Sequence, residues 1–163
     1  MTIDDLIRRV TSYTRLPETE TVLASAYEIA EKVHRGFQRL NGEPVISHPL
    51  EVATILAEWH APLPVVATGL LHDIHSPDYS SGYDLNDVKL RLGTDISGML
   101  KAITNLNSFV RQIEKSFDRE GEVETNLRYM MSVLQEEPDA VIIKLVDRLH
   151  NLQTIMTGHL MFP

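Results

Sequence analysis

A His-Asp pair at the end of an apolar segment is the part of the sequence with the clearest chemical meaning. His72 and Asp73 follow the apolar run 65–71, and a third ionisable residue, His75, comes within one helical turn. Neighbouring residues on a helix point about 100° apart, so a group lying between them, such as a metal ion, would use both side chains. A metal ion needs more than two ligands, and the rest of the chain must supply them.

Two further residues complete a candidate metal site. His48 stands at the expected entrance of a helix, and Asp147 lies inside an apolar helical segment. A carboxylate among apolar neighbours must be paired, metal-bound or exposed. With the His-Asp pair, the set offers two imidazoles and two carboxylates, which suit Mn²⁺, Fe²⁺ or Zn²⁺ better than Ca²⁺. Taken singly, each residue is explained as well by a hydrogen-bonded or solvent-exposed side chain, because isolated motif matches are often accidental.

The composition is that of one globular domain covering residues 1–163. Hydrophobic residues make up 43% of the 163 residues and charged residues 23%, and this length is enough to bury a sizeable core. The absence of cysteine excludes disulfides, thiolate zinc sites and cysteine nucleophiles, and it fits a cytoplasmic protein. The formal charge of −8 argues against nucleic acid as a partner, because binding to phosphate backbones needs clustered Lys and Arg.

Neither a membrane span nor a secretory signal is expected. No apolar run approaches the roughly 18 residues of a transmembrane helix. The first residues, 1–5, lack the basic flank and apolar segment of a signal peptide. The short apolar tail, 160–163, suggests a truncated chain, so the sequence fits either a stand-alone protein or a domain cut from a longer one.

Nearly every long segment has helical periodicity, which predicts an all-α fold. Helices are expected over residues 3–13, from 19 or 21 to about 35, and over 50–60, 65–75, 85–92, 96–106, 122–136 and 140–156. Pro49 disfavours a helical backbone at His48, so residues 45–48 are expected to be extended. Asp84 and Asp95 are expected to cap the helices that follow them.

Five separated blocks of sequence become specific when they are read together. They are His-Arg-Gly-Phe-Gln-Arg (34–39), Gly-Glu-Pro (42–44), His-Pro-Leu-Glu-Val-Ala (48–53), Gly-Leu-Leu-His-Asp (69–73) and Lys-Leu-Val-Asp-Arg-Leu-His-Asn-Leu (144–152). In this order and at these spacings the set resembles the HD hydrolase domain of the RelA/SpoT family. The resemblance runs from near residue 20 to near residue 156 and implies an HD-domain helical bundle.

The resemblance also implies a metal and a reaction. In that family one Mn²⁺ (or another divalent metal) is held by the residues that correspond here to His48, His72, Asp73 and Asp147. The family reaction removes the 3′-pyrophosphate from guanosine tetra- or pentaphosphate, ppGpp or pppGpp. The metal would polarise a phosphate oxygen and help to activate a water. The implied partner is therefore one of these nucleotides or a related one.

Four residues match family positions that bind the nucleotide. Arg39 corresponds to an arginine near the guanine base, where its planar charged group can stack on an aromatic face. Lys144, Arg148 and Asn151 correspond to positions around the metal and the nucleotide, and Thr154 follows Asn151 by one helical turn. The alternative for the three cationic side chains is solvated surface charge.

The sequence departs from the family directly after the His-Asp pair. Active members continue with a Glu-Asp pair that positions and deprotonates the attacking water, whereas this chain has Ser76 and Pro77. Neither is a general base near neutral pH. Milder departures are Phe37 in place of Gln, Leu40 in place of Lys and Asn105 in place of Lys.

One histidine is the expected catalytic substitute for the missing pair. His75 lies three residues after His72, on the same side of the helix if the helix continues, and histidine titrates near neutrality. It could also simply cap the helix end. Asp78 and Asp84 are further candidates, although turn or capping roles explain them better.

Three functions fit these observations. The first is a metal-dependent phosphohydrolase resembling (p)ppGpp 3′-pyrophosphohydrolases, with weak or altered activity. The second is a catalytically degenerate HD module that binds a nucleotide or a partner. The third is an HD-type hydrolase of another nucleoside phosphate, with His75 recruited for the chemistry.

Overall fold

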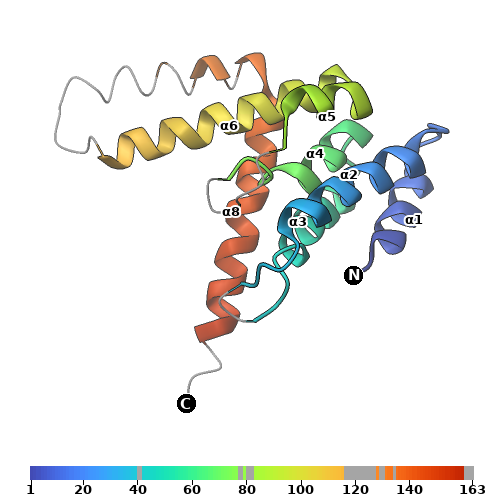
Figure 1. Ribbon diagram of the computed structural model, residues 1–163, viewed down its shortest axis with the longest axis horizontal. Coiled ribbons are helices and arrows are strands. Elements are labelled where there is room, and N and C mark those ends of the chain that lie inside the picture. The colour runs from blue at the N-terminus through green and yellow to red at the C-terminus, as the bar shows by residue number, and fades with distance from the viewer. Residues whose placement is uncertain are drawn as a thin grey trace.

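One apolar helix forms the centre of the computed structural model. Helix α4 (Leu63–Leu71) is buried at eight of its nine positions, as expected for a helix that is hydrophobic on all sides. It packs against α2 (Thr19–His34), α3 (Ser47–Glu58), α6 (Thr94–Lys115) and α8 (Pro138–His159), which surround it in Figure 1. The His-Asp pair follows at its C-terminal end, so the candidate site lies against the core.

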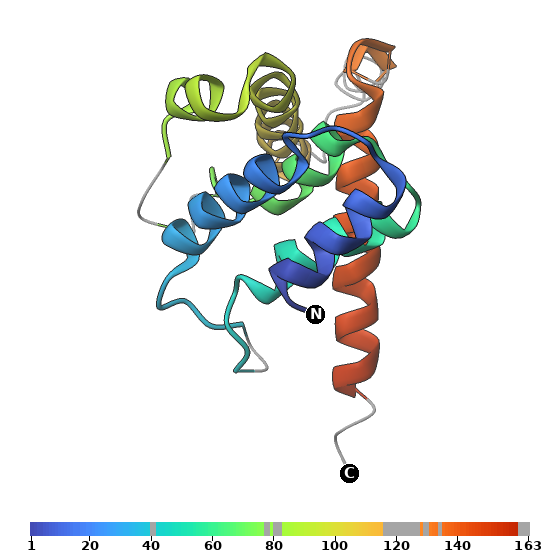
Figure 2. The same ribbon diagram turned by 90° about the vertical axis from the view of Figure 1, so that its right-hand side faces the viewer.

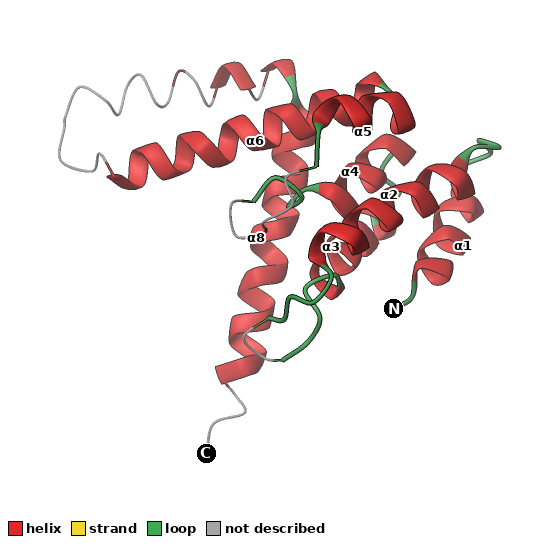
Figure 3. Ribbon diagram, viewed as in Figure 1, coloured by secondary structure: helices red, strands yellow, loops and turns green. Residues whose placement is uncertain are grey.

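The described residues confirm the all-α prediction. The structure describes residues 1–39, 42–76, 79, 83–115, 128, 131–133 and 135–159, with backbone only at 110–115 and 156–159. Over these ranges the elements are helices joined by turns and loops, without a strand (Figure 3). Among the described residues, one isolated antiparallel β-bridge pairs Gln38 with Pro44 across the loop that precedes α3. The predicted tail, 160–163, lies outside the described residues.

The two outer helices have the predicted bounds. Helix α1 (Ile3–Tyr13) packs against α2 and α3, and α5 (Leu85–Leu92) packs against α6 and α2. Asp84 caps α5 as predicted, because its carboxylate accepts a 2.9 Å hydrogen bond from the Asn86 backbone N–H. Gly93 ends α5 with a φ of 93°, a conformation that glycine adopts without strain.

The entrance to α3 corrects one prediction. His48 is helical rather than extended, because α3 begins at Ser47, and the His48 N–H donates to the Val45 carbonyl at 3.0 Å. Pro49 fits the first turn because its missing N–H would have had no partner within the helix. This bond to the preceding turn offsets the usual preference of a residue before proline for an extended backbone.

Several other helix ends also differ from the prediction. Helix α4 ends at Leu71 instead of continuing to His75, and the next residues form turns with bonds such as Ser76 N–H to the Asp73 carbonyl at 2.9 Å. Asp95 lies in the first turn of α6 rather than capping it. Helices α6 and α8 run on to residues 115 and 159 because polar stretches propagate a helix once it has been nucleated.

The leucines of helix α8 predict a buried face that the structure leaves exposed, and a different face of the helix packs inward. Ile143 and Val146 are fully buried and Asp147 is 5% exposed, whereas Leu145 and Leu152 are 63% and 58% exposed. The helix runs along one side of the bundle, past α4 and α3, towards the C-terminus (Figures 1 and 2). Its polar residues therefore face the end of α4 and the start of α3.

Within the part of the chain that the structure describes, no helix combines the length and the apolar character needed to cross a membrane.

Candidate metal centre

The four predicted metal ligands meet at one point, although they come from three helices. His48 lies in the first turn of α3, His72 and Asp73 follow α4, and Asp147 lies in the middle of α8. His48, His72 and Asp73 each offer one donor atom, and these three atoms lie within 4.8 Å of one another. Asp147 Oδ1 lies 3.1 Å from His48 Nε2 and 3.6 Å from His72 Nε2. Three ligands are almost completely buried, whereas the Asp73 side chain is 23% exposed and marks the open side.

The ring of His72 is oriented as a metal ligand needs to be. Its Nδ1 lies 2.8 Å from the Gly69 carbonyl, which accepts the Nδ1 proton and leaves a lone pair on Nε2. Nε2 is buried and has no hydrogen-bond partner among the described residues, although the carboxylates of Asp73 and Asp147 face it at 3.2 and 3.6 Å. A buried nitrogen without a partner is costly, so this arrangement fits a site in which a cation lies beside Nε2.

The spacing of the donor atoms also fits a small divalent cation. Asp73 Oδ2 lies 3.2 Å from His72 Nε2 and 3.6 Å from His48 Nε2. Ligands bound at about 2.1 Å to one ion stand roughly 3.0–3.5 Å apart in tetrahedral or octahedral geometry. The donor set of two nitrogens and two carboxylates is one that Mn²⁺, Fe²⁺ and Zn²⁺ accept.

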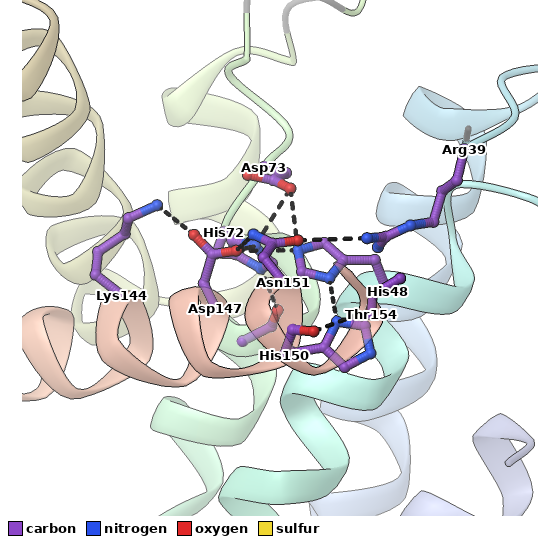
Figure 4. A network of polar contacts seen from close by, with 10 residues as sticks. Arg39, His48, His72, Asp73, Lys144, Asp147, His150, Asn151 and Thr154 are labelled. Atoms are coloured by element: carbon purple, nitrogen blue, oxygen red, sulfur yellow. Dashed lines mark hydrogen bonds and ion pairs between the residues drawn. The ribbon is translucent and has the colours of Figure 1, made fainter. Parts of the chain in front are cut away.

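A chain of polar side chains fixes the carboxylate of Asp147. Lys144 Nζ donates to Oδ2 at 2.6 Å, and Asn151 Nδ2 donates to Oδ1 at 2.8 Å. Arg39 Nη2 in turn donates to Asn151 Oδ1 at 3.3 Å, so the network reaches from α8 to the loop before α3 (Figure 4). Three of the four predicted nucleotide-binding residues thus lie beside the candidate metal ligands.

Without a metal, the surroundings shift the pKa values of His72 and His48 in opposite directions. Burial opposes the charged form of His72, but the carboxylates of Asp73 and Asp147 outweigh it and raise the pKa of His72 to about 10. Burial lowers the pKa of His48 despite its hydrogen bond to Asp147. The pKa values of both carboxyl groups are lowered, because the neighbouring histidines outweigh the effect of burial. A metal ion would take the place of the proton on His72.

His48 has a partner that the sequence analysis missed. Its Nδ1 lies 2.8 Å from Nδ1 of His150, and the two ring centres are 4.9 Å apart. Burial, followed by the nearby His48 and Arg39, lowers the pKa of His150 to about 4. The signal in the sequence was its position three residues after Asp147, which places both side chains on one side of α8.

A comparison with protein families identifies this architecture. The family model described as HD domain matches residues 26–159. The chain belongs to the HD domain family. Its most similar curated relatives include a GTP pyrophosphokinase of Streptomyces antibioticus, which is 34% identical over 155 residues, or 94% of this chain. Two others are the probable GTP diphosphokinase RSH3, chloroplastic, of Arabidopsis thaliana (33% identical over 93% of this chain) and GTP pyrophosphokinase rsh of Brucella melitensis (31% over 93%).

These relatives confirm the predicted resemblance to the RelA/SpoT family. The present chain spans about a fifth of their length, 17% of the Streptomyces protein and 20% of the Arabidopsis protein. A solved structure described as "A metazoan ortholog of SpoT hydrolyzes ppGpp and plays a role in starvation responses" matches with a TM-score of 0.60 at 21% identity. The match covers 88% of this chain and 73% of that one and shows a shared fold.

The segment after the ligands is arranged differently from the expectation for a catalytic histidine. His75 Nε2 lies 2.7 Å from the Tyr83 carbonyl and donates its proton there. Because α4 ends at Leu71, the expected helical alignment of His75 with His72 is wrong. Ser76 is described, whereas Pro77 and Asp78 lie outside the described residues. Asp84 is exposed and caps α5.

The two remaining α8 residues differ, because Thr154 belongs to the polar network drawn in Figure 4, whereas Arg148 has an exposed side chain. Arg148 is exposed, since it follows Asp147 and points about 100° further around α8. Its predicted role in nucleotide binding stays a prediction. Thr154 donates a 2.9 Å hydrogen bond to the His150 carbonyl one turn earlier, which places it next to the ring pair.

A second histidine that the sequence analysis missed lies behind the ligands. His34, at the end of α2, is 2% exposed, and neither ring nitrogen has a hydrogen-bond partner among the described residues. Its ring packs edge-on against Tyr79 at 4.6 Å, and Tyr79 packs against Phe37 at 5.2 Å. Burial lowers the pKa of His34 to about 4. The aromatic contact therefore joins the ligand region to the segment that departs from the family.

Proposed function

We propose that this HD domain is a metal-dependent phosphohydrolase that removes the 3′-pyrophosphate from ppGpp, pppGpp or a related guanosine nucleotide. The observation that carries the proposal is the inward-facing set of four donor atoms, with His72 Nε2 buried and free to bind a cation. The relatives named as GTP pyrophosphokinases support a guanosine nucleotide as the partner.

In this proposal His48, His72, Asp73 and Asp147 hold a divalent metal, for which Mn²⁺ is the expected ion. When bound, the ion would supply Lewis-acid polarisation of a phosphate and lower the pKa of water. The partial exposure of Asp73 gives the ion an open side towards substrate. The buried positions of the other three ligands exclude water from the opposite side.

The protein's own charged groups would position the nucleotide around this centre. Arg39 lies at the rim and is already held by Asn151 at 3.3 Å, so it can bind a base or a phosphate with little loss of side-chain freedom. Lys144 is committed to Asp147 at 2.6 Å and would offer its remaining N–H donors to phosphate. Arg148 is proposed as a peripheral contact.

His75 is proposed as the group that accepts a proton from the attacking water. Since its Nε2 donates to the Tyr83 carbonyl, the free lone pair is on Nδ1. The pair of variants His75→Gln and His75→Ala tests this role, because a glutamine amide can still donate to Tyr83 whereas alanine cannot. A catalytic role predicts that both lose turnover by about 100-fold or more. Full turnover in His75→Gln with a loss only in His75→Ala would leave His75 a structural role alone.

The second candidate function is a nucleotide-binding HD module without turnover. The observation favouring it is that the residue at the first position of the missing Glu-Asp pair, Ser76, cannot act as a base, while the neighbouring histidine is bonded to backbone. It predicts metal binding and nucleotide affinity in the wild-type protein with no hydrolysis.

One experiment separates the two functions. The protein loaded with Mn²⁺ is incubated with ppGpp, pppGpp and a panel of other nucleoside phosphates, and released pyrophosphate and phosphate are measured. Turnover that is lost in His48→Ala and Asp147→Ala supports the hydrolase, and the panel identifies its substrate. Binding of metal and nucleotide without product supports the binding module. Full metal content in both variants would contradict the ligand set.

A further inference from the structure

The contact between His48 and His150 carries an inference about how the metal ligand is prepared. We propose that His150 is a positioning residue that accepts the Nδ1 proton of His48 and thereby presents His48 Nε2 as an unprotonated ligand. The inference rests on the proposed metal site and adds a residue to which neither the sequence analysis nor the comparisons gave a role.

The rings of His48 and His150 meet through their Nδ1 atoms. The two Nδ1 atoms are 2.8 Å apart, a distance at which one must donate and the other accept. His48 Nε2 faces Asp147 Oδ1 at 3.1 Å and Asp73 Oδ2 at 3.6 Å, so it points into the ligand cluster. The edge of His48 opposite the cluster is therefore the edge that meets His150.

A neutral imidazole carries one proton, and a ring that binds metal through Nε2 must carry that proton on Nδ1. His48 is only 5% exposed, so a proton on its Nδ1 needs an acceptor within the protein. The nitrogen within reach is His150 Nδ1, which accepts when His150 holds its own proton on Nε2.

The two histidines of the candidate metal site have different acceptors for their Nδ1 protons. His72 donates its Nδ1 proton to the Gly69 carbonyl at 2.8 Å, and a carbonyl oxygen can only accept a hydrogen bond. His48 gives its proton to a side chain that could also donate. Without metal, the reverse arrangement is possible, in which His150 donates and His48 Nε2–H is bonded to Asp147. Metal binding would select the arrangement in which His150 accepts.

The helix that carries His150 makes this contact dependable. His150 and Asp147 are three residues apart on α8, so one rigid element holds a ligand and the partner of another ligand. Thr154 donates to the His150 carbonyl at 2.9 Å, which fastens the same turn. Displacement of α8 would therefore disturb His48 and Asp147 together.

The test measures Mn²⁺ affinity by titration calorimetry in three variants of the full chain. His150→Leu removes the acceptor, and we expect its affinity to fall by about 10- to 100-fold, as for other outer partners of metal-bound histidines. His150→Asn places an amide oxygen near the position of Nδ1, so we expect it to recover most of that loss. His60→Asn is the matched control, because it removes an exposed histidine whose backbone φ of 56° also suits asparagine.

A second readout follows the proton itself. Nitrogen NMR of the protein with diamagnetic Zn²⁺ should show the His48 ring protonated at Nδ1 in the wild type. Unchanged affinity in His150→Leu with a normal melting temperature, or a His48 ring protonated at Nε2 in the metal-bound protein, would overturn the inference. If the wild type binds no metal at all, the proposed function fails with it. If His48→Ala alone abolishes binding while His150→Leu does not, only the inference fails.

Discussion

The ligand cluster (His48, His72, Asp73 and Asp147) and the described residues of the following segment (74–76, 79 and 83) are built in different ways. In the cluster, donor atoms converge, and the buried His72 Nε2 faces two carboxylates without a hydrogen-bond partner among the described residues. In the following segment the described polar groups are bonded to the protein itself, as in the 2.7 Å contact of His75 with the Tyr83 carbonyl. The cluster thus contains a buried nitrogen that is open to a cation, whereas the His75 ring is already bonded to the backbone. Under the proposed function, this difference separates the residues that would bind the metal from those that would activate water.

Restoring the missing pair is the change with the largest expected effect on this difference. The double variant Ser76→Glu, Pro77→Asp supplies carboxylates where active RelA/SpoT hydrolases have them. We expect the rate of pyrophosphate release from ppGpp to rise by about 100-fold or more, the usual contribution of a general base. The control is the same pair combined with Asp147→Asn, which should stay inactive. An unchanged rate would show that the following segment does not limit turnover.

Removing a ligand charge should disable the cluster and leave the following segment intact. Asp147→Asn keeps the size of the side chain but removes the charge that His48 and Lys144 face at 3.1 and 2.6 Å. We expect Mn²⁺ affinity to fall by more than about 100-fold, beyond the loss typical of an outer partner. Asp84→Asn is the control, since asparagine caps a helix as well as aspartate does. Equal metal content in both variants would remove Asp147 from the ligand set.

The close approach of α3 and α4 can be tested through stability. A Cβ on Gly69 would stand 2.6 Å from Leu56 Cδ1 and 3.4 Å from Ala53 Cα, and Leu56 is fully buried. We expect Gly69→Ala to lower the free energy of unfolding by about 1–3 kcal/mol through overpacking, measured by urea denaturation. Gly98→Ala is the matched control. Its Cβ would meet nothing closer than 3.9 Å, so a gain of up to about 1 kcal/mol is expected.

The buried histidine between the two regions should give the smallest effect, visible as a pH dependence. The pKa of His34 is lowered to about 4 in the fold, whereas an unfolded histidine titrates near about 6.5. The unfolded state therefore binds the proton first, and stability is present above pH 6.5 and lost as the pH falls towards 4. Between pH 7 and pH 5, the free energy of unfolding of His34→Phe should fall by about 1–2 kcal/mol less than that of the wild type, measured in EDTA. Parallel losses in the two proteins would contradict this assignment.

The sequence predicted the members of the cluster better than their surroundings. Residue type and order brought His48, His72, Asp73 and Asp147 together as candidate ligands. The structure places their side chains close to one another, and their binding of a metal stays a prediction. Periodicity was enough for α1 and α5, whose bounds were predicted to the residue. The start of α3 was missed because a bond from His48 to Val45 overrides a local preference that the sequence alone suggests.

By itself, the sequence determined an all-α chain with an apolar helical run at residues 65–71 and a set of candidate metal ligands. Only the tertiary structure decided which side of α8 faces inward. Its leucines form an apolar stripe, yet Leu145 is 63% exposed while Asp147 is buried. Hydrophobicity favours burial of any apolar face, but a buried carboxylate requires partners that only other elements provide. His48, Lys144 and Asn151 provide them here, and that choice also brings His150 to His48.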